Sequence, residues 1–455
     1  MRIRSQRQLY FKIQSEITRP EDELQGMSIR LESLPGYNNI LSKVLADLIP
    51  SGRSKQTGRS GMTAEQVLKA LIVQMRKGYS YRELAHATRD SLSVREFLKI
   101  PPFSKGFHYK TLQANIKLIE EETLDLLGAE LKSFALFQGI EDGKNIRTDG
   151  FNTQVNIHYP TDWSLMHDSI RVLSRIMCYT HEDLQVPIKF VNHYRASKKK
   201  TFKIHNDKSH KRRRRLNIEL IRLTRRTLGY SRQALLVMEN YKSCKTTQEQ
   251  LYLGSLIADL KRFLPLVENV INQAHRRIVK GEKVSSKEKI VSIFEEHTDI
   301  IYKGSRNVIF GHKSTITTGK SGLILDIDIH DGNPADATLV KGVIGRHEQF
   351  YGAVPNGAVF DGCYSSNDNR DFAEKVGIQN VCFSKETDEL SSCSPSMRKK
   401  LRNFRAGIEA TVSMLMRMFG LTRVMNKGFR SFRTTVKAAV VTYNLFILSR
   451  IPLRT

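Results

Sequence analysis

Cysteine, tryptophan and long apolar runs are scarce in this chain of 455 residues. The five cysteines are odd in number and none lies in a C-x-x-C pair, so a disulfide framework or a cysteine-rich zinc site is not expected, and a reducing compartment fits best. No window approaches the roughly 20 apolar residues that a membrane-spanning helix needs. The first residues also lack the apolar core of a signal peptide. We therefore expect a globular protein that works inside the cell and away from membranes.

Acidic residues are also few relative to basic ones, with 46 Asp+Glu against 73 Lys+Arg and a formal net charge of +27. Such an excess needs a polyanionic partner, and nucleic acid is the first candidate. Residues 191–230 hold 14 Lys+Arg and 2 Asp+Glu, so 14 − 2 places +12 in this stretch. Its candidate DNA contacts are Lys198, Lys199, Lys200, Lys211, Arg212, Arg213, Arg214 and Arg215. A solvated, partly disordered linker and a nuclear import signal are the alternatives. Because the stretch leads into the helical pattern LNIELIRLTRRTLG, we favour a nucleic-acid contact.

Changes in residue pattern divide the chain into three parts. Residues 1–135 are expected to form a helical DNA-binding or dimerisation domain, with capping-box patterns at Thr63–Gln66, Ser80–Glu83 and Ser93–Glu96. Strand and helix patterns alternate in residues 136–163 and 300–440. Between them, residues 164–299 are expected to form a basic helical insertion. The sequence thus predicts a mixed α/β domain interrupted by helices.

Three acidic residues occupy distinctive places in that α/β part. Asp149 lies in a predicted strand, Asp361 ends the apolar strand AVF, and Glu409 lies on a long helix beside its apolar stripe. We expect Glu409 to point towards the sheet rather than into bulk water. Two strand acids that converge with a helix acid can hold two Mg²⁺ ions about 3.5–4 Å apart, an arrangement suited to phosphodiester cleavage. Oxygen ligands favour hard cations such as Mg²⁺ or Mn²⁺. Any one of these acids alone is more often a cap or a solvated side chain.

Four segments resemble bacterial insertion-sequence DDE transposases, and most closely their ISNCY-type branch. TDGF…IHYPTDWSL (148–165) is similar to the first-aspartate block, FDGCYSS…N (360–369) to the second, and RAGIEATVSML…FGLTR (405–423) to the glutamate helix. GYSYREL…RDSLSVREFL (78–98) resembles their helical N-terminal region. The chain departs from the pattern at Arg402, where a tyrosine is common, and at Cys363, which breaks a Gly-Tyr pair.

The resemblance implies an RNase H-like catalytic domain, with a mixed sheet flanked by helices, in which Asp149, Asp361 and Glu409 bind two Mg²⁺ ions, with Mn²⁺ as a substitute. It also implies double-stranded DNA as partner, both transposon ends and target, a homodimer on that DNA, and a cytoplasmic, nucleoid-associated protein of a prokaryote. Arg405 lies one helical turn before Glu409 and is expected to bind a phosphate or to pair with Glu409. Arg402 is a further candidate DNA contact.

Several alternatives stay open at this point. A catalytically inactive DNA-binding repressor or architectural protein derived from a transposase is one, and an RNA-directed nuclease on the same fold is another. If Asp361 were not the second carboxylate, the cluster Asp326, Asp328, Asp331 and Asp336 would be the next choice. Asp326 and Asp328 share one strand face, where solvent exposure is expected. Trp163 and Tyr159 could stack on an unpaired base, although core packing is the expected role of Trp163.

Overall fold

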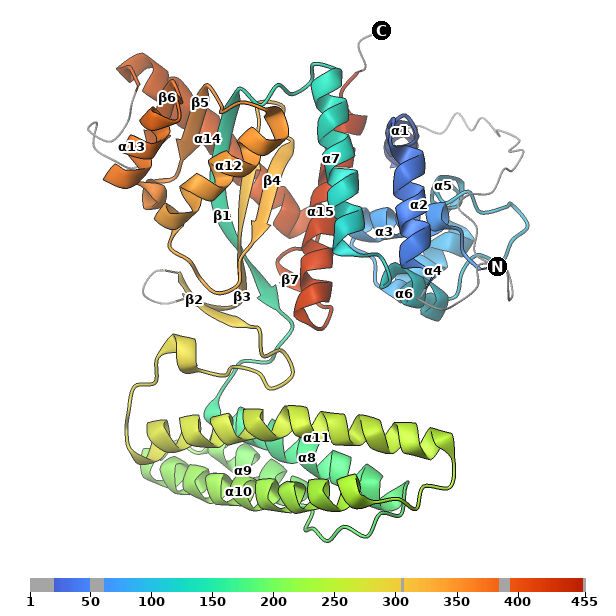
Figure 1. Ribbon diagram of the computed structural model, residues 1–455, viewed down its shortest axis with the longest axis vertical. Helices are drawn as coiled ribbons and strands as arrows, with labels where there is room; N and C mark the ends of the chain where they lie inside the picture. The colour runs from blue at the N-terminus through green and yellow to red at the C-terminus, as the bar shows by residue number, and fades with distance from the viewer. Residues whose placement is uncertain (1–19, 50–60, 304–306, 384–392, 453–455) are drawn as a thin grey trace. The chain divides into compact units, whose positions relative to one another are not determined.

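The computed structural model describes residues 20–49, 61–303, 307–383 and 393–452 (Figure 1). Contacts divide the chain into two compact units, residues 1–156 with 311–455 and residues 157–310. We call the first the sheet unit and the second the helical unit. No helix in the described ranges has both the length and the apolar character to cross a membrane.

The sheet unit begins with helices, as the sequence predicts. They are α1 (Pro20–Glu32), α2 (Tyr37–Asp47), α3 (Ala64–Lys77), α4 (Tyr81–Asp90), α5 (Leu92–Phe97), α6 (Tyr109–Ile116) and α7 (Glu121–Phe137). The capping boxes at Thr63 and Ser80 are confirmed, since each hydroxyl accepts from the N3 amide and each N3 side chain bonds back. The predicted box at Ser93 is wrong. Ser91 caps α5 instead, because its hydroxyl already accepts from the amide of Val94.

Within the described ranges, seven strands form one mixed sheet, which confirms the predicted α/β class. They are β1 (Asn145–Val155), β2 (Asp299–Lys303), β3 (Asn307–Thr318), β4 (Ile324–Ile329), β5 (Gly357–Phe360), β6 (Asn380–Phe383) and β7 (Arg423–Val424). The order is β2-β3-β1-β5-β6, with β4 on β3 and β7 on β1. β1 runs antiparallel to β3 and parallel to β5, and β5 runs parallel to β6.

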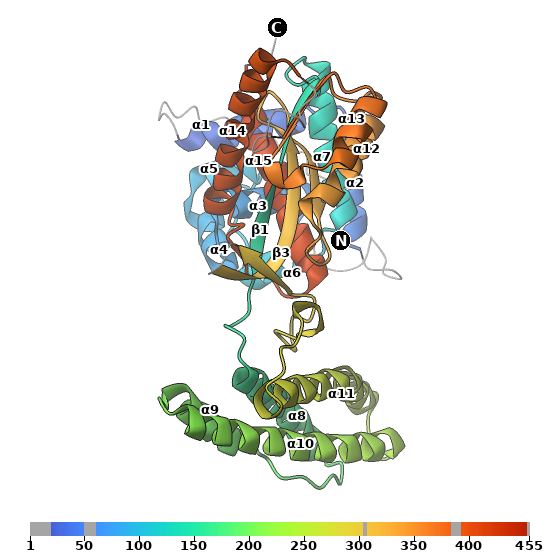
Figure 2. The same ribbon diagram turned by 90° about the vertical axis from the view of Figure 1, so that its left-hand side faces the viewer.

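Helices cover both faces of this sheet. They are α12 (Val340–Tyr351), α13 (Asn367–Lys375), α14 (Pro395–Met418) and α15 (Phe429–Ser449). Figure 2 shows α14 on one face of the strands and α12 with α13 on the other. The strand β5, GAVF, is buried at every position, as expected for a parallel strand covered on both faces. Its carboxyl end therefore emerges between packed layers, directly before Asp361.

The helical unit contains α8 (Asp162–Glu182), α9 (Tyr194–Asn206), α10 (His210–Asn240) and α11 (Thr247–Ala274), followed by a π-helical turn η1 (His275–Val279). These helices pack around one apolar core, which includes Leu173, Leu220 and Leu260. The basic stretch lies on α9 and α10, and Ser209 caps α10. It is therefore helical rather than the disordered linker that was the alternative. Trp163 packs partly buried against the same core, as expected.

Candidate functional site

The register of two parallel strands places the first two candidate acids side by side. Thr148 on β1 pairs with Phe360 on β5, so Asp149 and Asp361 are the next residues of adjacent strands. Helix α14, which carries Glu409, packs against β1, β5 and β6. Asp149 and Asp361, separated by more than 200 positions in the sequence, thus meet at the carboxyl end of β5.

Arg405 lies at the centre of these three carboxylates. Its guanidinium nitrogens lie 3.1 Å from Glu409, 3.6 Å from Asp149 and 3.8 Å from Asp361. The side chains of Arg405, Asp149 and Asp361 are 17, 24 and 19 % exposed, so water screens these pairs only in part. The expected pairing of Arg405 with Glu409 is therefore present, and the two aspartates, which the sequence did not assign to Arg405, complete the cluster.

Glu409 departs from the expectation that it faces the sheet, because its side chain is 66 % exposed. Ile408, the preceding residue, is fully buried and occupies the core-facing position at this turn of α14. Since consecutive helical residues point about 100° apart, Glu409 is directed to the rim. It reaches the two aspartates through Arg405.

Burial raises the pKa of Asp149 above its ordinary value, and the charges of Asp361 and Glu409 raise it further. The amide of Gly150, which donates to the Asp149 Oδ1 atom at 2.7 Å, and the charge of Arg405 act in the opposite direction. A cation beside two partly buried aspartates and a third, exposed acid offsets their mutual repulsion. In this structure that cation is the Arg405 guanidinium.

The donor set is suited to a hard divalent cation, since it consists only of carboxylate oxygens. Among the residues that the structure describes, however, no group of three or more His, Cys, Asp or Glu side chains is arranged closely enough to hold a metal ion. The three carboxylates instead converge on the Arg405 guanidinium. The donor set therefore suits Mg²⁺ in its chemistry, while the described geometry is that of three carboxylates around one guanidinium.

Two residues that the sequence analysis missed hold α14 against β1. Arg147 is 8 % exposed and donates at 2.6 Å to the carbonyl of Phe404, the residue before Arg405, and at 2.8 Å to the hydroxyl of Thr318. Gly407 faces the same guanidinium, where any side chain would collide with it. The signals were present in the sequence: a charged residue between Ile146 and Thr148 in a predicted strand, and a glycine inside a long helix, where it costs about 0.5–1 kcal/mol.

The alternative acidic cluster is engaged elsewhere, and the expectation that its strand residues are solvent-exposed is wrong. Arg346 on α12 bonds Asp326 at 2.9 Å and Asp328 at 3.1 Å, and the side chain of Asp326 is 19 % exposed. Asp336 pairs with Lys313 at 2.7 Å. Helix α12 covers that face of β4 and supplies the arginine, which the strand alternation alone does not reveal.

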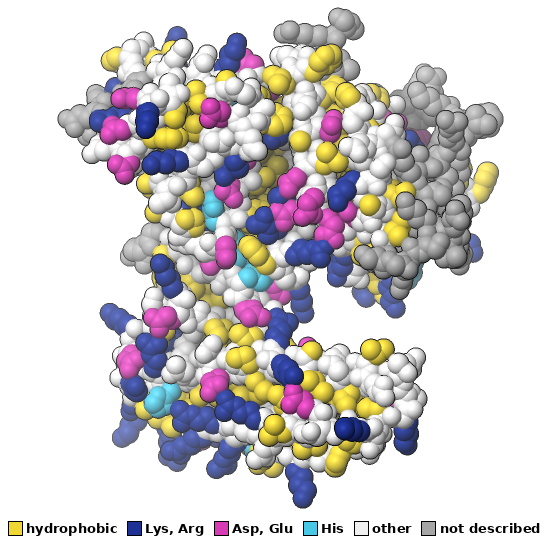
Figure 3. Space-filling model, in the orientation of Figure 1, with side chains coloured by type: hydrophobic (Ala, Val, Ile, Leu, Met, Phe, Trp, Pro, Cys, Tyr) yellow, Lys and Arg dark blue, Asp and Glu magenta, His cyan; other side chains and the backbone are white. Residues whose placement is uncertain are grey.

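The basic residues of the helical unit fall into two groups. Glu219 pairs with Lys200 at 2.6 Å and with Arg215 at 3.4 Å, Asp207 pairs with Arg212 at 3.1 Å, and Arg214 donates to the carbonyls of Ile278 and Val279. Lys198, Lys199 and Lys211 are exposed, and Arg213 is half-buried. Lys and Arg side chains gather at the lower left of the helical unit in Figure 3. This face presents a dense positive charge to solvent.

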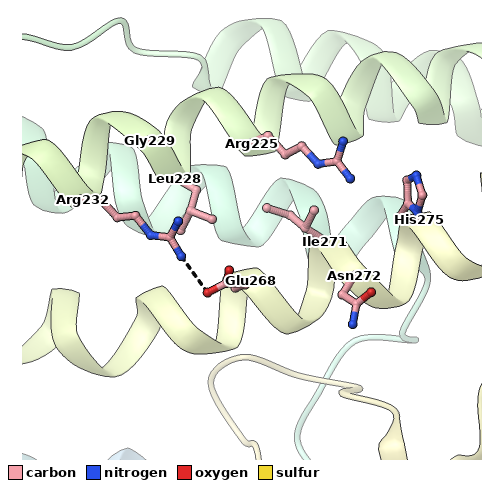
Figure 4. Close-up of a pocket in the computed structure, with 8 residues that line it drawn as sticks. All are labelled: Arg225, Leu228, Gly229, Arg232, Glu268, Ile271, Asn272 and His275. Atoms are coloured by element: carbon pink, nitrogen blue, oxygen red, sulfur yellow. Dashed lines mark hydrogen bonds and ion pairs between the residues drawn. The ribbon is translucent and has the colours of Figure 1, made fainter.

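A groove of about 360 Å³ lies between α10 and α11, and arginines of α10 line it (Figure 4). Arg232 bonds Glu268 across it at 2.7 Å, while Arg225 and His275 line the other end. Gly229 leaves its wall open, because no atom lies within 4 Å of the position a side chain would take. The exposed face of α10 is therefore basic well beyond Arg215. Arg402 is exposed on α14.

Comparison with known proteins bears on the N-terminal helices. Residues 30–118 match the family model described as a transposase domain (DUF772). No curated protein and no solved structure matches the chain significantly. The matched residues run from the end of α1 through α6, and they support a transposase-family protein. Asp149, Asp361 and Glu409 lie outside the matched range, so their roles depend on geometry and on sequence resemblance.

Proposed function

We propose that this protein is a DDE transposase of the ISNCY-type branch, with an RNase H-like catalytic domain in the sheet unit. The observation that carries the proposal is the convergence of Asp149, Asp361 and Glu409 within 4 Å of one guanidinium. The transposase-domain match at residues 30–118 supports the same class of protein. The proposed reaction is cutting of DNA at insertion-sequence ends and joining of those ends to target DNA.

Asp149, Asp361 and Glu409 would hold two Mg²⁺ ions, or Mn²⁺ in their place. When bound, such ions supply an activated hydroxyl nucleophile and stabilise the leaving oxygen of a phosphodiester. The chain's own part is to hold the carboxylates in place, and Arg147 contributes by fixing the turn of α14 that carries Arg405 and Glu409.

Arg405 would exchange its partners when DNA binds. Its planar guanidinium suits bidentate contact with a phosphate as well as with a carboxylate. In the free protein it neutralises the three acids, and a phosphate beside the scissile bond would draw it away from them. Arg405, which lies among the three acids in the free protein, would thus become a DNA contact together with Arg402.

The basic face of α9 and α10 would bind the DNA backbone. Lys198, Lys199 and Lys211 extend into solvent, whereas Lys200, Arg212 and Arg215 share two acidic partners. Phosphate contacts from such side chains position DNA without reading its sequence. Two transposon ends must be held together for transposition, so a homodimer on DNA is part of the proposal.

The proposal is tested by cleavage of duplex DNA that carries the ends of the element, in Mg²⁺ and in EDTA. We expect Asp149→Ala, Asp361→Ala and Glu409→Ala each to abolish cleavage and to retain DNA binding. Asp371→Ala, which removes an exposed acid outside both the triad and the alternative cluster, serves as the control and should cleave normally. Equal cleavage by the wild type and all three variants would reject the site. Binding without any cleavage by the wild type would favour the inactive DNA-binding protein.

A further inference from the structure

Two tyrosines of the helical unit are exposed to solvent, although large aromatic side chains are usually at least partly buried. Tyr159, which precedes α8, is 73 % exposed, and Tyr302 on β2 is 58 % exposed. Both line one pocket of about 160 Å³ together with Phe310 on β3. The rings of Tyr159 and Phe310 meet edge to face, 5.6 Å apart. Exposed aromatic side chains gathered in one concave place indicate a binding site more than scattered ones do.

The walls of this pocket are fixed by hydrogen bonds. Gln273 is 6 % exposed, and its amide both accepts from the Ile290 N–H at 2.9 Å and donates to the Ile290 carbonyl at 3.3 Å. Asp162, also in the lining, bonds Arg277 at 2.8 Å. These contacts join α8, α11 and η1 to the loop before β2. The pocket is therefore built by packed elements and presents a defined shape.

Its chemistry has three components. Aromatic rings offer flat faces, the Asp162–Arg277 ion pair offers hydrogen-bonding groups at one side, and Lys289 supplies positive charge. Aromatic faces bind bases of any sequence by stacking, and cations beside them bind the flanking phosphates. A purely apolar ligand would leave the hydrogen-bonding groups and the positive charge unused. A fully paired duplex, whose bases are already stacked on one another, would leave the aromatic faces unused.

We propose that this pocket, the Tyr159–Tyr302 pocket, binds an unpaired nucleobase of DNA. The inference depends on the proposed function, because a DNA substrate supplies the base. It adds a binding site that lies outside the carboxylate cluster and off the basic face of α9 and α10. A base held there would keep the strands of a cut or opened end apart.

The test is the binding of the full-length protein to two duplexes of the same sequence in EDTA, which prevents Mg²⁺-dependent cleavage. One duplex is fully paired, and the other carries 2-aminopurine at an unpaired position. We expect tighter binding of the second, with quenching of 2-aminopurine fluorescence on stacking. Tyr159→Ala and Tyr302→Ala should each reduce this preference about 5- to 160-fold, in line with alanine substitutions at base-stacking sites. Affinity for the paired duplex should stay unchanged.

Two control variants separate stacking from other effects. Tyr159→Phe keeps the ring and should keep the quenching, which also guards against loss through misfolding. Tyr179→Ala removes an exposed tyrosine of α8 that does not line the pocket and should behave as the wild type. Equal affinity for both duplexes, or quenching that survives both alanine variants, would overturn the inference. If end cleavage persists in that case, only this pocket assignment fails. If tyrosine-dependent quenching holds while the wild type never cleaves, the pocket stands and the proposed catalysis fails.

Discussion

Replacing Arg405 with glutamine removes a cation that lies within 4 Å of all three candidate carboxylates. Exposed ion pairs contribute about 0–1 kcal/mol each, and breaking a buried pair costs about 3–5 kcal/mol. Arg405 and the two aspartates are 17–24 % exposed, between these limits, whereas Glu409 at 66 % contributes least. We therefore expect Arg405→Gln to lower the free energy of unfolding by about 2 kcal/mol when no divalent metal is present.

Mg²⁺ should reverse this loss. Without the guanidinium, the three acids lose the cation that they share, so the variant should bind Mg²⁺ more tightly than the wild type. A ligand present at 100 times its Kd stabilises the folded state by about 2.7 kcal/mol, enough to offset the loss. The measurement is urea unfolding in EDTA and over a range of Mg²⁺ concentrations, supported by titration with Mn²⁺ followed by electron paramagnetic resonance.

Lys399→Gln is the matched control, since it removes one exposed positive charge from the same helix. It should shift neither the EDTA midpoint nor the Mg²⁺ response. Adding Asp149→Asn and Asp361→Asn to Arg405→Gln should abolish the rescue by Mg²⁺. An Arg405→Gln protein that unfolds at the wild-type midpoint and binds Mn²⁺ with the wild-type affinity would refute the reasoning.

Three further predictions concern the packing and charge of the two units. Gly407→Ala should destabilise the protein by about 1–3 kcal/mol in chemical unfolding, because the new methyl group meets the Arg147 side chain, whereas Gly345→Ala, with open space around it, should be neutral or slightly stabilising. Hydrogen bonds from Arg433 lower the pKa of Glu121 to about 2. The stability contributed by this carboxylate is therefore complete above its ordinary pKa and is lost as pH falls from about 4.5 towards 2. Glu121→Gln should make the free energy of unfolding less dependent on pH in that window, and an unchanged pH profile would contradict the assignment. Neutralising Lys198, Lys199 and Lys211 should make the dependence of log affinity on log salt less steep by up to about 2.7, at roughly 0.9 per phosphate contact. The measurement is anisotropy titration with duplex DNA over a range of salt concentrations. An unchanged slope would place the DNA contacts elsewhere.

Local signals predicted much of the secondary structure because they act within a few residues. The capping boxes at Thr63 and Ser80 depend on groups three positions apart, and the apolar stripe of α10 follows its own helical period. The buried strand before Asp361 was visible as a short apolar run. The error at Ser93 arose because two serines, Ser91 and Ser93, compete for one helix start, and only the hydrogen bond to Val94 decides between them.

The sequence by itself determined the α/β class, the basic helices and the three acids as candidates, since composition, periodicity and motif resemblance are properties of the chain. Tertiary structure decided which charges meet. Parallel pairing of β1 with β5 aligned Asp149 with Asp361, and packing of α14 on both strands brought Arg405 between them. It also gave Asp326 and Asp328 an arginine partner from α12. Partners that come from segments remote in the sequence leave no periodic signal, because their contact exists only after the strands pair and the helices pack on them.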